Sequence, residues 1–432
     1  MLNYFFGINN IFLNVVISLS VGLSSTTFLK LLSLSVILFT FLLTSCSTDD
    51  EIINEPELNV IKSTSDPIAG QYIVVLKNNY EGKSNRKPLS YDNEMVALRK
   101  EIPSQFSELK ISDKNLKQTF GFALNGFTAV LNDKQLAQLK KDPRVKSIEQ
   151  DYIISLGKPS GTPGGGGGGG GGADPIQETP WGITRIGGAT NGSGKTAWII
   201  DSGIDSDHPD IDVDIARSRS YVTKGAYSIE DGNGHGTHVA GTVAALDNNI
   251  GVVGVAPGAK IVALRVLDNR GSGSFSWSIA ALDYVFANGS PGDAVNMSLG
   301  PQSRYTDTAV DAATNAVASR NIKIAIAAGN SSDDALYYSP ARTGLNNSNI
   351  YTVASMTSSN SWSSFSNYGS PVDVIAPGSS VKSTYKDGGY ATLSGTSMAS
   401  PHVCGLLLLG DITADGSVTR TGGNDSYPIA HN

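Results

Sequence analysis

The sequence from Ile176 to the C-terminus alternates short apolar runs with helical patterns, and this alternation constrains the fold more than any other feature of the chain. AWII, KIVALRVL and AVNMSL are each followed by a stretch of helical periodicity, whereas IKIAIAA is followed by a loop-rich stretch that includes VDVIAPG. Repeated units of this kind form a parallel sheet covered by helices on both faces. We therefore predict an α/β fold with a doubly wound parallel sheet, in which ligands collect at the carboxyl ends of the strands.

A smaller α+β unit is predicted between Gly70 and Leu156. Its elements are the strand QYIVVLK, a charged helical stretch at 93–109, the strand GFTAVLND, the helix KQLAQLKKDP and the strand VKSIEQDYIISL. Nine consecutive glycines, Gly164 to Gly172, separate this unit from the C-terminal one. A run without side chains has nothing to pack and keeps maximal chain entropy, so we expect a protease-sensitive linker there.

The N-terminus has the pattern of an export signal. Lys30 precedes the apolar run 31–43, and the sequence LTS leads into Cys46. This pattern resembles a bacterial lipoprotein signal with its lipobox, which implies cleavage before Cys46 and acylation of its thiol. A plain secretory signal or a membrane anchor is the alternative, although the run is short for a membrane-spanning helix. We expect export from a bacterial cell as a precursor anchored by its lipid at the outer membrane or cell surface.

Charge and cysteine content limit the partners and the means of stabilisation. The formal net charge is −7, with the acidic excess after Ile176, so nucleic acid is not an expected partner. The only cysteines are Cys46 and Cys404, and once Cys46 is acylated no disulfide can form within the mature chain. We expect a monomer that meets the membrane only through its lipid and is stabilised by something other than disulfides.

Two chemistries compete in residues 188–205, which read GATNGSGKTAWIIDSGID. The GKT at 194–196 fits a loose phosphate-loop pattern, but such a loop leads from a strand into a helix, whereas this GKT runs directly into the β-rich AWII. We interpret it as a surface turn. The functional residue of the stretch is then Asp201, which ends the buried strand.

Asp201, His235 and Ser397 supply the three groups of a nucleophilic hydrolase. A serine hydroxyl is a weak nucleophile unless an imidazole takes its proton, and a carboxylate fixes the tautomer of that imidazole. Of the five histidines, only His235 has flanking glycines and nearby partners of this kind. We interpret His238 and His402 as packed neighbours; His208 and His431 are expected at the surface, without metal.

The segments IIDSGID, DGNGHGTHVAGT and SGTSMASPHV closely resemble the three signature segments of the subtilisin-like serine proteases, or subtilases, and occur in that family's order. The resemblance extends from about Gln177 to about Leu409. It implies a subtilisin-like fold in which Asp201 is the orienting carboxylate, His235 the general base and acid, and Ser397 the nucleophile. It also implies that Asn330 is the side-chain donor to the oxyanion.

The resemblance further implies where substrate binds, as an extended strand between two chain edges. One edge is Gly271, Ser272 and Gly273, and the other is Ser298, Leu299 and Gly300. The S1 pocket would be lined by Ala327, Ala328 and Gly329. These small walls suggest a broad pocket for apolar or aromatic P1 residues, and the loop after Asn330 looks more like that of proteinase K than that of subtilisin.

A structural calcium ion is also implied by the resemblance. The sequence LDNNIGV at 246–252 is similar to the subtilisin calcium loop. Six oxygens, a number that Ca²⁺ accepts, would come from the side chains of Gln177, Asp210 and Asn248 and the carbonyls of Leu246, Ile250 and Val252. Such an ion could stabilise the fold as disulfides do elsewhere.

Residues 70–154 resemble the family's propeptide of the inhibitor I9 type, a small ferredoxin-like α+β domain. The resemblance implies an intramolecular chaperone and inhibitor, removed by autocatalytic cleavage between about Leu156 and Ile176. The expected segments are signal and lipobox 1–46, tether 47–69, propeptide 70–157, glycine-rich linker 158–175 and catalytic domain 176–432.

Two functions remain open. The first is a secreted, calcium-stabilised serine endopeptidase of broad specificity that acts on protein and peptide substrates. The second is a non-catalytic, surface-tethered module with the same fold. The second is favoured only by the short tail, because 35 residues follow Ser397 and Gly410-Asp411 interrupts the helix that begins near it. The sequence does not show how this tail completes the core.

Overall fold

The computed structural model describes residues 66–77, 90–156, 176–222 and 228–432. Cys46, the tether up to residue 65, the glycine-rich linker and most of the expected cleavage window lie outside these residues. Within the part of the chain that is described, no helix is both long enough and apolar enough to cross a bilayer.

The C-terminal unit is built on a nine-stranded sheet in the order β15-β16-β12-β11-β10-β9-β5-β7-β6. All neighbouring strands are parallel except the terminal pair β15 and β16. The strands are β5 (Thr196–Asp201), β6 (Arg219–Ser220), β7 (Lys260–Arg265), β9 (Ala294–Met297), β10 (Lys323–Ala327), β11 (Ile350–Met356), β12 (Val372–Pro377), β15 (Thr413–Thr419) and β16 (Ser426–His431). A smaller hairpin joins β13 (Val381–Tyr385) to β14 (Gly389–Leu393).

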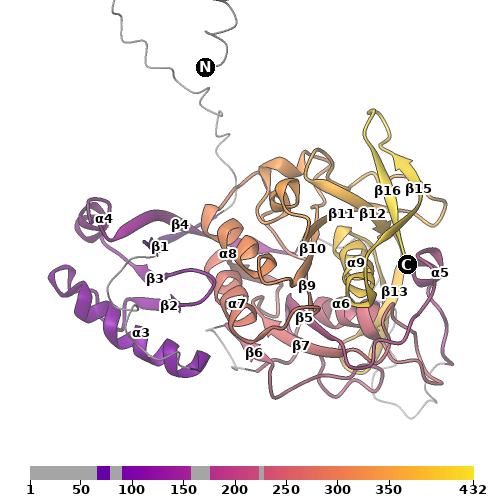
Figure 1. Ribbon diagram of the computed structural model, residues 1–432, viewed down its shortest axis with the longest axis horizontal. Helices are drawn as coiled ribbons and strands as arrows, with labels where there is room; N and C mark the ends of the chain where they lie inside the picture. Colours follow the sequence, from indigo (N-terminus) through magenta and orange to yellow (C-terminus); the bar gives the residue numbers. More distant parts are fainter. Residues whose placement is uncertain (1–65, 78–89, 157–175, 223–227) are drawn as a thin grey trace, which may run out of the picture. The chain divides into compact units, whose positions relative to one another are not determined.

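Helices cover both faces of this sheet. Because side chains alternate along a strand, Trp198 and Ile200 of β5 pack in one core with α7 (Phe275–Asn288) and α8 (Thr308–Ala318). Ala197 and Ile199 pack in a second core with α6 (His235–Ala244) and α9 (Thr396–Leu409). Figure 1 shows these two helix pairs on opposite sides of strands β9 and β10. The predicted doubly wound α/β fold is confirmed.

The N-terminal unit has the element order β1 (Pro67–Leu76), α3 (Tyr91–Gln105), β2 (Leu116–Phe120), β3 (Gly126–Val130), α4 (Asp133–Leu139) and β4 (Val145–Ser155). This βαββαβ order, with the sheet arranged β2-β3-β1-β4, is ferredoxin-like, as predicted. Its core is separate and contains Leu98, Phe106, Phe127 and Leu139. The fifth strand of its sheet is β8 (Ser272–Ser274), which belongs to the C-terminal unit. Short helical turns complete the fold at η1 (Ser107–Leu109), α5 (Trp181–Arg185), η2 (Ala335–Tyr337) and η3 (Ala341–Asn346).

Two sequence interpretations can be compared directly with the fold. Gly194 and Lys195 are exposed before β5, and Thr196 is the buried first residue of that strand. The GKT is therefore a surface turn leading into a strand, as interpreted. The stretch after IKIAIAA, by contrast, contains the buried strand β11, which the sequence analysis assigned to a loop-rich region. Strand β11 lies between β10 and β12 in the sheet, and its short apolar run is flanked by polar loops.

The C-terminal tail completes the sheet. Strand β16 adds beside β12 in parallel, with Ile429 opposite Ile375. Tyr427, Ile429 and Ala430 are buried, and the ring of Tyr427 lies 5.6 Å from that of Trp362, centroid to centroid. Residues 413–431 therefore extend the sheet with a β-hairpin whose apolar side chains pack against the core.

Ile429→Ala should reveal how much this hairpin stabilises the C-terminal unit. The side chain is 2 % exposed, and removing three buried carbon atoms should cost roughly 2–5 kcal/mol of unfolding free energy. Thermal unfolding followed by circular dichroism measures the effect. Ser417→Ala, on the exposed face of the same hairpin, is the control and should leave the midpoint unchanged. Equal midpoints for both variants would show that the tail does not contribute to the core.

Candidate active site

Asp201 is the last residue of β5 and is 1 % exposed. Its Oδ1 lies 2.8 Å from Nδ1 of His235 and also accepts the backbone N–H of Ser202 at 2.7 Å. A carboxylate at this nitrogen holds the imidazole in the tautomer with a proton on Nδ1. Nε2 then carries a lone pair and is the nitrogen available as a base.

His235 begins α6, where a tight turn presents it to Asp201. Gly234, just before it, has φ 105°, a left-handed conformation that side chains disfavour. A Cβ atom at Gly234 would also lie 2.3 Å from the ring of Tyr385. The glycine of the motif is therefore required by both backbone conformation and space.

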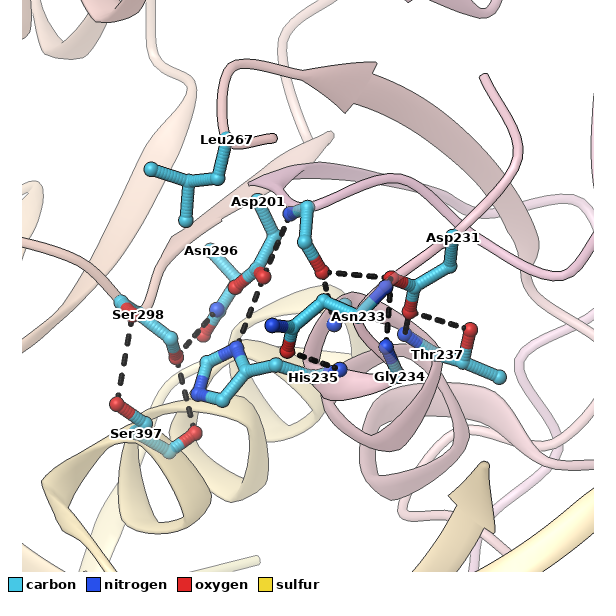
Figure 2. Close-up of polar contacts among 12 residues, drawn as sticks. Asp201, Asp231, Asn233, Gly234, His235, Thr237, Leu267, Asn296, Ser298 and Ser397 are labelled. Atoms are coloured by element: carbon cyan, nitrogen blue, oxygen red, sulfur yellow. Dashed lines mark hydrogen bonds and ion pairs between the residues drawn. The ribbon is translucent and has the colours of Figure 1, made fainter. Parts of the chain in front are cut away.

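Ser397 lies at the second position of α9 and is 8 % exposed. Its Oγ donates a hydrogen bond of 3.3 Å to the carbonyl oxygen of Ser298, while Ser298 Oγ donates to the carbonyl of Ser397 at 2.9 Å. Figure 2 shows the ring of His235 between the carboxylate of Asp201 and the side chain of Ser397. The three predicted catalytic residues, 196 positions apart at their extremes, thus meet at one place.

Asn330 follows β10 beside the same serine. Its Oδ1 accepts both the backbone N–H and the hydroxyl of Thr396, each at 2.8 Å. Because the amide oxygen is used in this way, the Nδ2–H group is the part of the side chain that remains to donate to a ligand. The backbone N–H of Ser397 is a second donor, since the first N–H groups of a helix have no partner within it.

A cavity of about 360 Å³ opens beside Ser397. It is lined by six of the nine residues predicted to bind substrate, namely Ser298, Leu299, Gly300, Ala327, Ala328 and Gly329. Tyr338, Ser339 and Ala341 also line it and were missed in the sequence analysis. They belong to the loop after Asn330. The sequence pointed to this loop only through its greater likeness to proteinase K than to subtilisin.

The last strand of the N-terminal unit lies in the cleft that was predicted to bind substrate. Ile154 pairs with Gly273 across the antiparallel β4–β8 contact. The N–H of Ser155 donates to the carbonyl of Gly300 at 3.2 Å, and that of Leu156 donates to the carbonyl of Gly271 at 2.9 Å. Both predicted edges therefore accept main-chain hydrogen bonds from a strand between them.

Buried carboxylates attach the N-terminal unit to helix α7. Asp283 of α7 is fully buried and accepts the backbone N–H groups of Gly121, Phe122 and Ala123. Burial raises the pKa of Asp283 to about 6, although these hydrogen bonds oppose the shift. A second contact has its carboxylate in the N-terminal unit: Asp151 of β4 accepts the N–H of Ser276 in the first turn of α7. A carboxylate is favourable at a helix N-terminus.

Asp210, Gln177 and Asn248 of the predicted calcium site lie together. The Oδ1 of Asp210 is 2.9 Å from Asn248 Nδ2, and the Oε1 of Gln177 accepts the Asn248 N–H at 2.6 Å. The N–H of Leu246 donates to the carbonyl of Asp210 at 3.0 Å, and the N–H of Val252 donates to its Oδ2 at 3.1 Å. Ile250 also belongs to this network, because its N–H donates to Asn248 Oδ1 at 2.7 Å.

The chemistry of these residues fits a hard cation. Asp210 is completely buried, its carboxylate accepts hydrogen bonds from the neutral groups of Asn248, Val252 and Tyr390, and burial raises its pKa to about 6. A cation there would supply the missing counter-charge, and amide and carbonyl oxygens are ligands that Ca²⁺ accepts. Within the described ranges, no group of three or more His, Cys, Asp or Glu side chains could hold a metal ion. The donors at this site would be one carboxylate with amide and backbone oxygens.

The sequence analysis expected His208 at the surface, and this was wrong. The side chain is buried, with 3 % exposed. Its Nε2 lies 2.9 Å from the carbonyl of Gly389, and Nδ1 accepts the N–H of Asp210 at 3.1 Å. Packing beneath the β13–β14 hairpin explains this burial. His238 and His402 are buried, as predicted.

Comparisons with known proteins agree with this geometry. Residues 192–410 match the subtilase family, and residues 71–157 match the peptidase inhibitor I9 family. The chain is 42% identical to alkaline serine exoprotease A of Vibrio alginolyticus over 68% of this chain and 53% of that protein, so it spans about half of that relative's length. It is 39% identical to subtilisin NAT of Bacillus subtilis subsp. natto over 69% of this chain and 74% of that protein.

A solved structure, that of a cold adapted subtilisin-like serine proteinase, is 41% identical and covers 55% of this chain and 85% of its own, with a TM-score of 0.47. The matched family segment spans half of the chain and contains Asp201, His235, Asn330 and Ser397. The chain therefore belongs to the subtilase family.

Proposed function

We propose that this protein is a secreted serine endopeptidase, made as a zymogen, that hydrolyses peptide bonds through an acyl-enzyme. The observation that carries the proposal is the 2.8 Å contact between Asp201 and His235 beside the hydroxyl of Ser397. Asn330 adds a donor next to that hydroxyl. A protein that only binds has no use for an oxyanion donor. The short C-terminal tail, which was the argument for a non-catalytic module, forms a strand beside β12.

The reaction uses these groups in sequence. The hydroxyl of Ser397 turns from the carbonyl of Ser298 to Nε2 of His235, which takes its proton as Oγ attacks the substrate carbonyl. Asp201 keeps Nδ1 protonated and stabilises the imidazolium. The developing oxyanion accepts hydrogen bonds from Asn330 Nδ2 and the N–H of Ser397. His235 then protonates the leaving amine, and a water molecule releases the acyl group by the same steps.

Substrate specificity is proposed to be broad, with apolar or aromatic P1 residues. Main-chain hydrogen bonds to Gly271 and Gly300 read any extended peptide. The cavity of about 360 Å³, with small walls at Ala327, Ala328 and Gly329, has room for a large side chain. Ile154 is fully buried in the same hydrophobic cluster as Phe275, which favours a second apolar side chain upstream of the cleaved bond.

Residues 70–157 are proposed to act as propeptide, inhibitor and folding partner of the catalytic domain at 176–432. The match to the I9 family and the occupied cleft support this role. We further propose export through the signal at 1–46, acylation of Cys46, and a tether at 47–69. Cleavage in or near the linker at 158–175 then frees a monomeric catalytic domain from the lipid anchor.

The register of β4 supports cleavage beyond Leu156. Ser155 bonds Gly300 on one edge and Leu156 bonds Gly271 on the other, so successive N–H groups alternate between edges. Ser298 lies two residues before Gly300 on the same edge, and its carbonyl oxygen is 3.3 Å from Ser397 Oγ. We therefore propose cleavage within the window from Leu156 to Ile176, beyond the end of this strand.

Intact-mass analysis of residues 47–432 with calcium, as wild type and Ser397→Ala, tests the proposal. Wild type should split between Leu156 and Ile176, because its own nucleophile attacks the chain that follows the strand in the cleft. Ser397→Ala should stay whole, since it lacks that nucleophile. If both proteins stay whole and neither cleaves casein, the non-catalytic alternative is favoured.

Calcium is proposed to bind Gln177, Asp210 and Asn248 with the carbonyls of the 246–252 loop. Chelation should then lower the unfolding midpoint, because at free calcium of 100 times Kd the ion contributes about 2.7 kcal/mol. Asp210→Asn should abolish the difference between calcium and chelator in scanning calorimetry. Asp212→Asn is the control, since that carboxylate pairs with Lys260 at the surface. An unchanged calcium effect in Asp210→Asn would exclude this site.

The pKa of Asp283 predicts that the propeptide complex weakens as pH rises. With Asp283 near its ordinary pKa of about 3.9 in the separated domain and about 6 in the complex, protonation favours the complex. The stabilisation of the complex by protonated Asp283 is complete below about pH 4 and is lost by about pH 6. Across this range the dissociation constant of the complex should rise up to about 100-fold. Size-exclusion chromatography of the cleaved complex at successive pH values measures it.

Asp283→Asn, which mimics the protonated acid, should reduce the steepness of this pH dependence. Asp373→Asn is a matched control, because burial also raises the pKa of Asp373, to about 7, but its partner is Thr352 within the C-terminal unit. A wild-type slope in Asp283→Asn would show that Asp283 does not control dissociation.

A further inference from the structure

Asp231 is a buried carboxylate that the proposed reaction does not use; it is 6 % exposed. It lies four residues before His235. Its Oδ1 accepts the backbone N–H groups of Asn233 at 3.0 Å and Gly234 at 2.7 Å, and its Oδ2 accepts the N–H of Thr237 at 2.9 Å and its hydroxyl at 2.7 Å. The backbone on both sides of His235 is therefore bonded to one side chain.

Ser202 connects this carboxylate to the strand that carries Asp201. Ser202 Oγ donates to Oδ1 of Asp231 at 2.8 Å and accepts the N–H of Gly236 at 2.9 Å. The N–H of Ser202 donates to Oδ1 of Asp201, the oxygen that also contacts His235. Figure 2 shows this network continuing from Asp201 to the start of α6.

We propose that Asp231 is a positioning residue that, through Ser202, holds His235 against Asp201. This inference rests on the proposed function. The hydrogen bonds form a closed path from Asp201 through Ser202 and Asp231 to the start of α6, and back through His235 to Asp201. Because a hydrogen bond weakens steeply as its distance and angle depart from ideal, fixing both backbones fixes the Asp201–His235 contact. The imidazole is then held in place when the hydroxyl of Ser397 turns toward it.

The number of donors explains why a carboxylate is needed. Asp231 accepts five hydrogen bonds and has no hydrogen of its own, as an ionised carboxylate can. An asparagine would turn an NH₂ group toward N–H or O–H donors and leave them unpaired. Asp231→Asn should therefore loosen the start of α6 while changing side-chain size very little.

The alternative is that Asp231 only stabilises the helix terminus. Self-cleavage of the full chain separates the two possibilities, because the strand is already in the cleft and the first-order rate follows the chemical step. Asp231→Asn should slow it about 10–100-fold, as expected for a misplaced catalytic group. Ser202→Ala, which keeps the charge and the bonds from Asp231 to α6, should slow it about tenfold. Asp373→Asn, which changes a half-buried carboxylate distant in the chain, should lower stability without slowing cleavage.

A second measurement is independent of turnover. In chains that also carry Ser397→Ala, the proton on Nδ1 of His235 should give a downfield NMR resonance from its hydrogen bond to Asp201. Asp231→Asn and Ser202→Ala should move this resonance upfield or broaden it, and Asp373→Asn should not. A purely structural role would lower the unfolding midpoint and leave the resonance in place.

Wild-type cleavage rates and an unchanged resonance in both Asp231→Asn and Ser202→Ala would overturn the inference. If Asp231→Asn does not fold, Ser202→Ala decides the question alone. If the wild-type chain itself does not cleave, the proposed function fails, whereas the resonance of His235 still tests whether Asp231 positions the imidazole.

Discussion

The site depends on the parallel arrangement of the central strands. Parallel strands end at the same edge of a sheet, so residues that follow different strands are brought together there. Asp201 ends β5, Ser298 follows β9 and Asn330 follows β10, while α9 brings Ser397 to the same edge. No local interaction could collect groups so far apart in the sequence. The sheet, with a helix pair on each face, provides the rigid frame that catalytic distances require.

Close backbone packing is the second requirement, and it explains the glycines of the signature segments. A Cβ atom at Gly236 would lie 2.1 Å from the carbonyl oxygen of Gly203, and one at Gly203 would lie 2.3 Å from that of Ile229. The end of β5 and the start of α6 are therefore almost in backbone contact. Only this proximity lets Ser202 and Asp231 bond across the gap and lets Asp201 reach His235. The glycines are thus spatial requirements of the catalytic geometry.

The sequence predicted those features that depend on local pattern. Buried parallel strands give continuous apolar runs, and β5, β7, β9 and β10 were found in this way. Strand β11 was missed because a short apolar run between polar loops is not distinctive. Strand β15 is almost wholly exposed, and β16 meets β12 about fifty residues away in sequence, so neither carries a local signal of its sheet position.

In the candidate site too, only features carried by a local sequence pattern could be predicted. Asp201, His235 and Ser397 lie in distinctive motifs and could be predicted, with roles taken from a family resemblance. Tyr338 lines the cavity only because the loop after Asn330 folds back over it. Asp231 lies within a signature segment, yet its bond to Ser202 depends on the packing of β5 against α6. Such roles follow from spatial neighbours, which a single sequence does not contain.

Under the proposed function, cleavage alone would not empty the candidate active site. The strand at Ile154 and Ser155 uses the same main-chain donors and acceptors that a substrate would use, so it competes directly for the cleft. Breaking one peptide bond removes neither this pairing nor the hydrogen bonds from the 121–123 turn to Asp283. Cleavage instead turns an intramolecular contact into a bimolecular one, whose strength then depends on dilution. Burial of Asp283 destabilises the complex whenever the carboxylate is ionised. The hydrogen bonds from the 121–123 turn to Asp283 therefore hold the complex together at a desolvation cost that limits its lifetime.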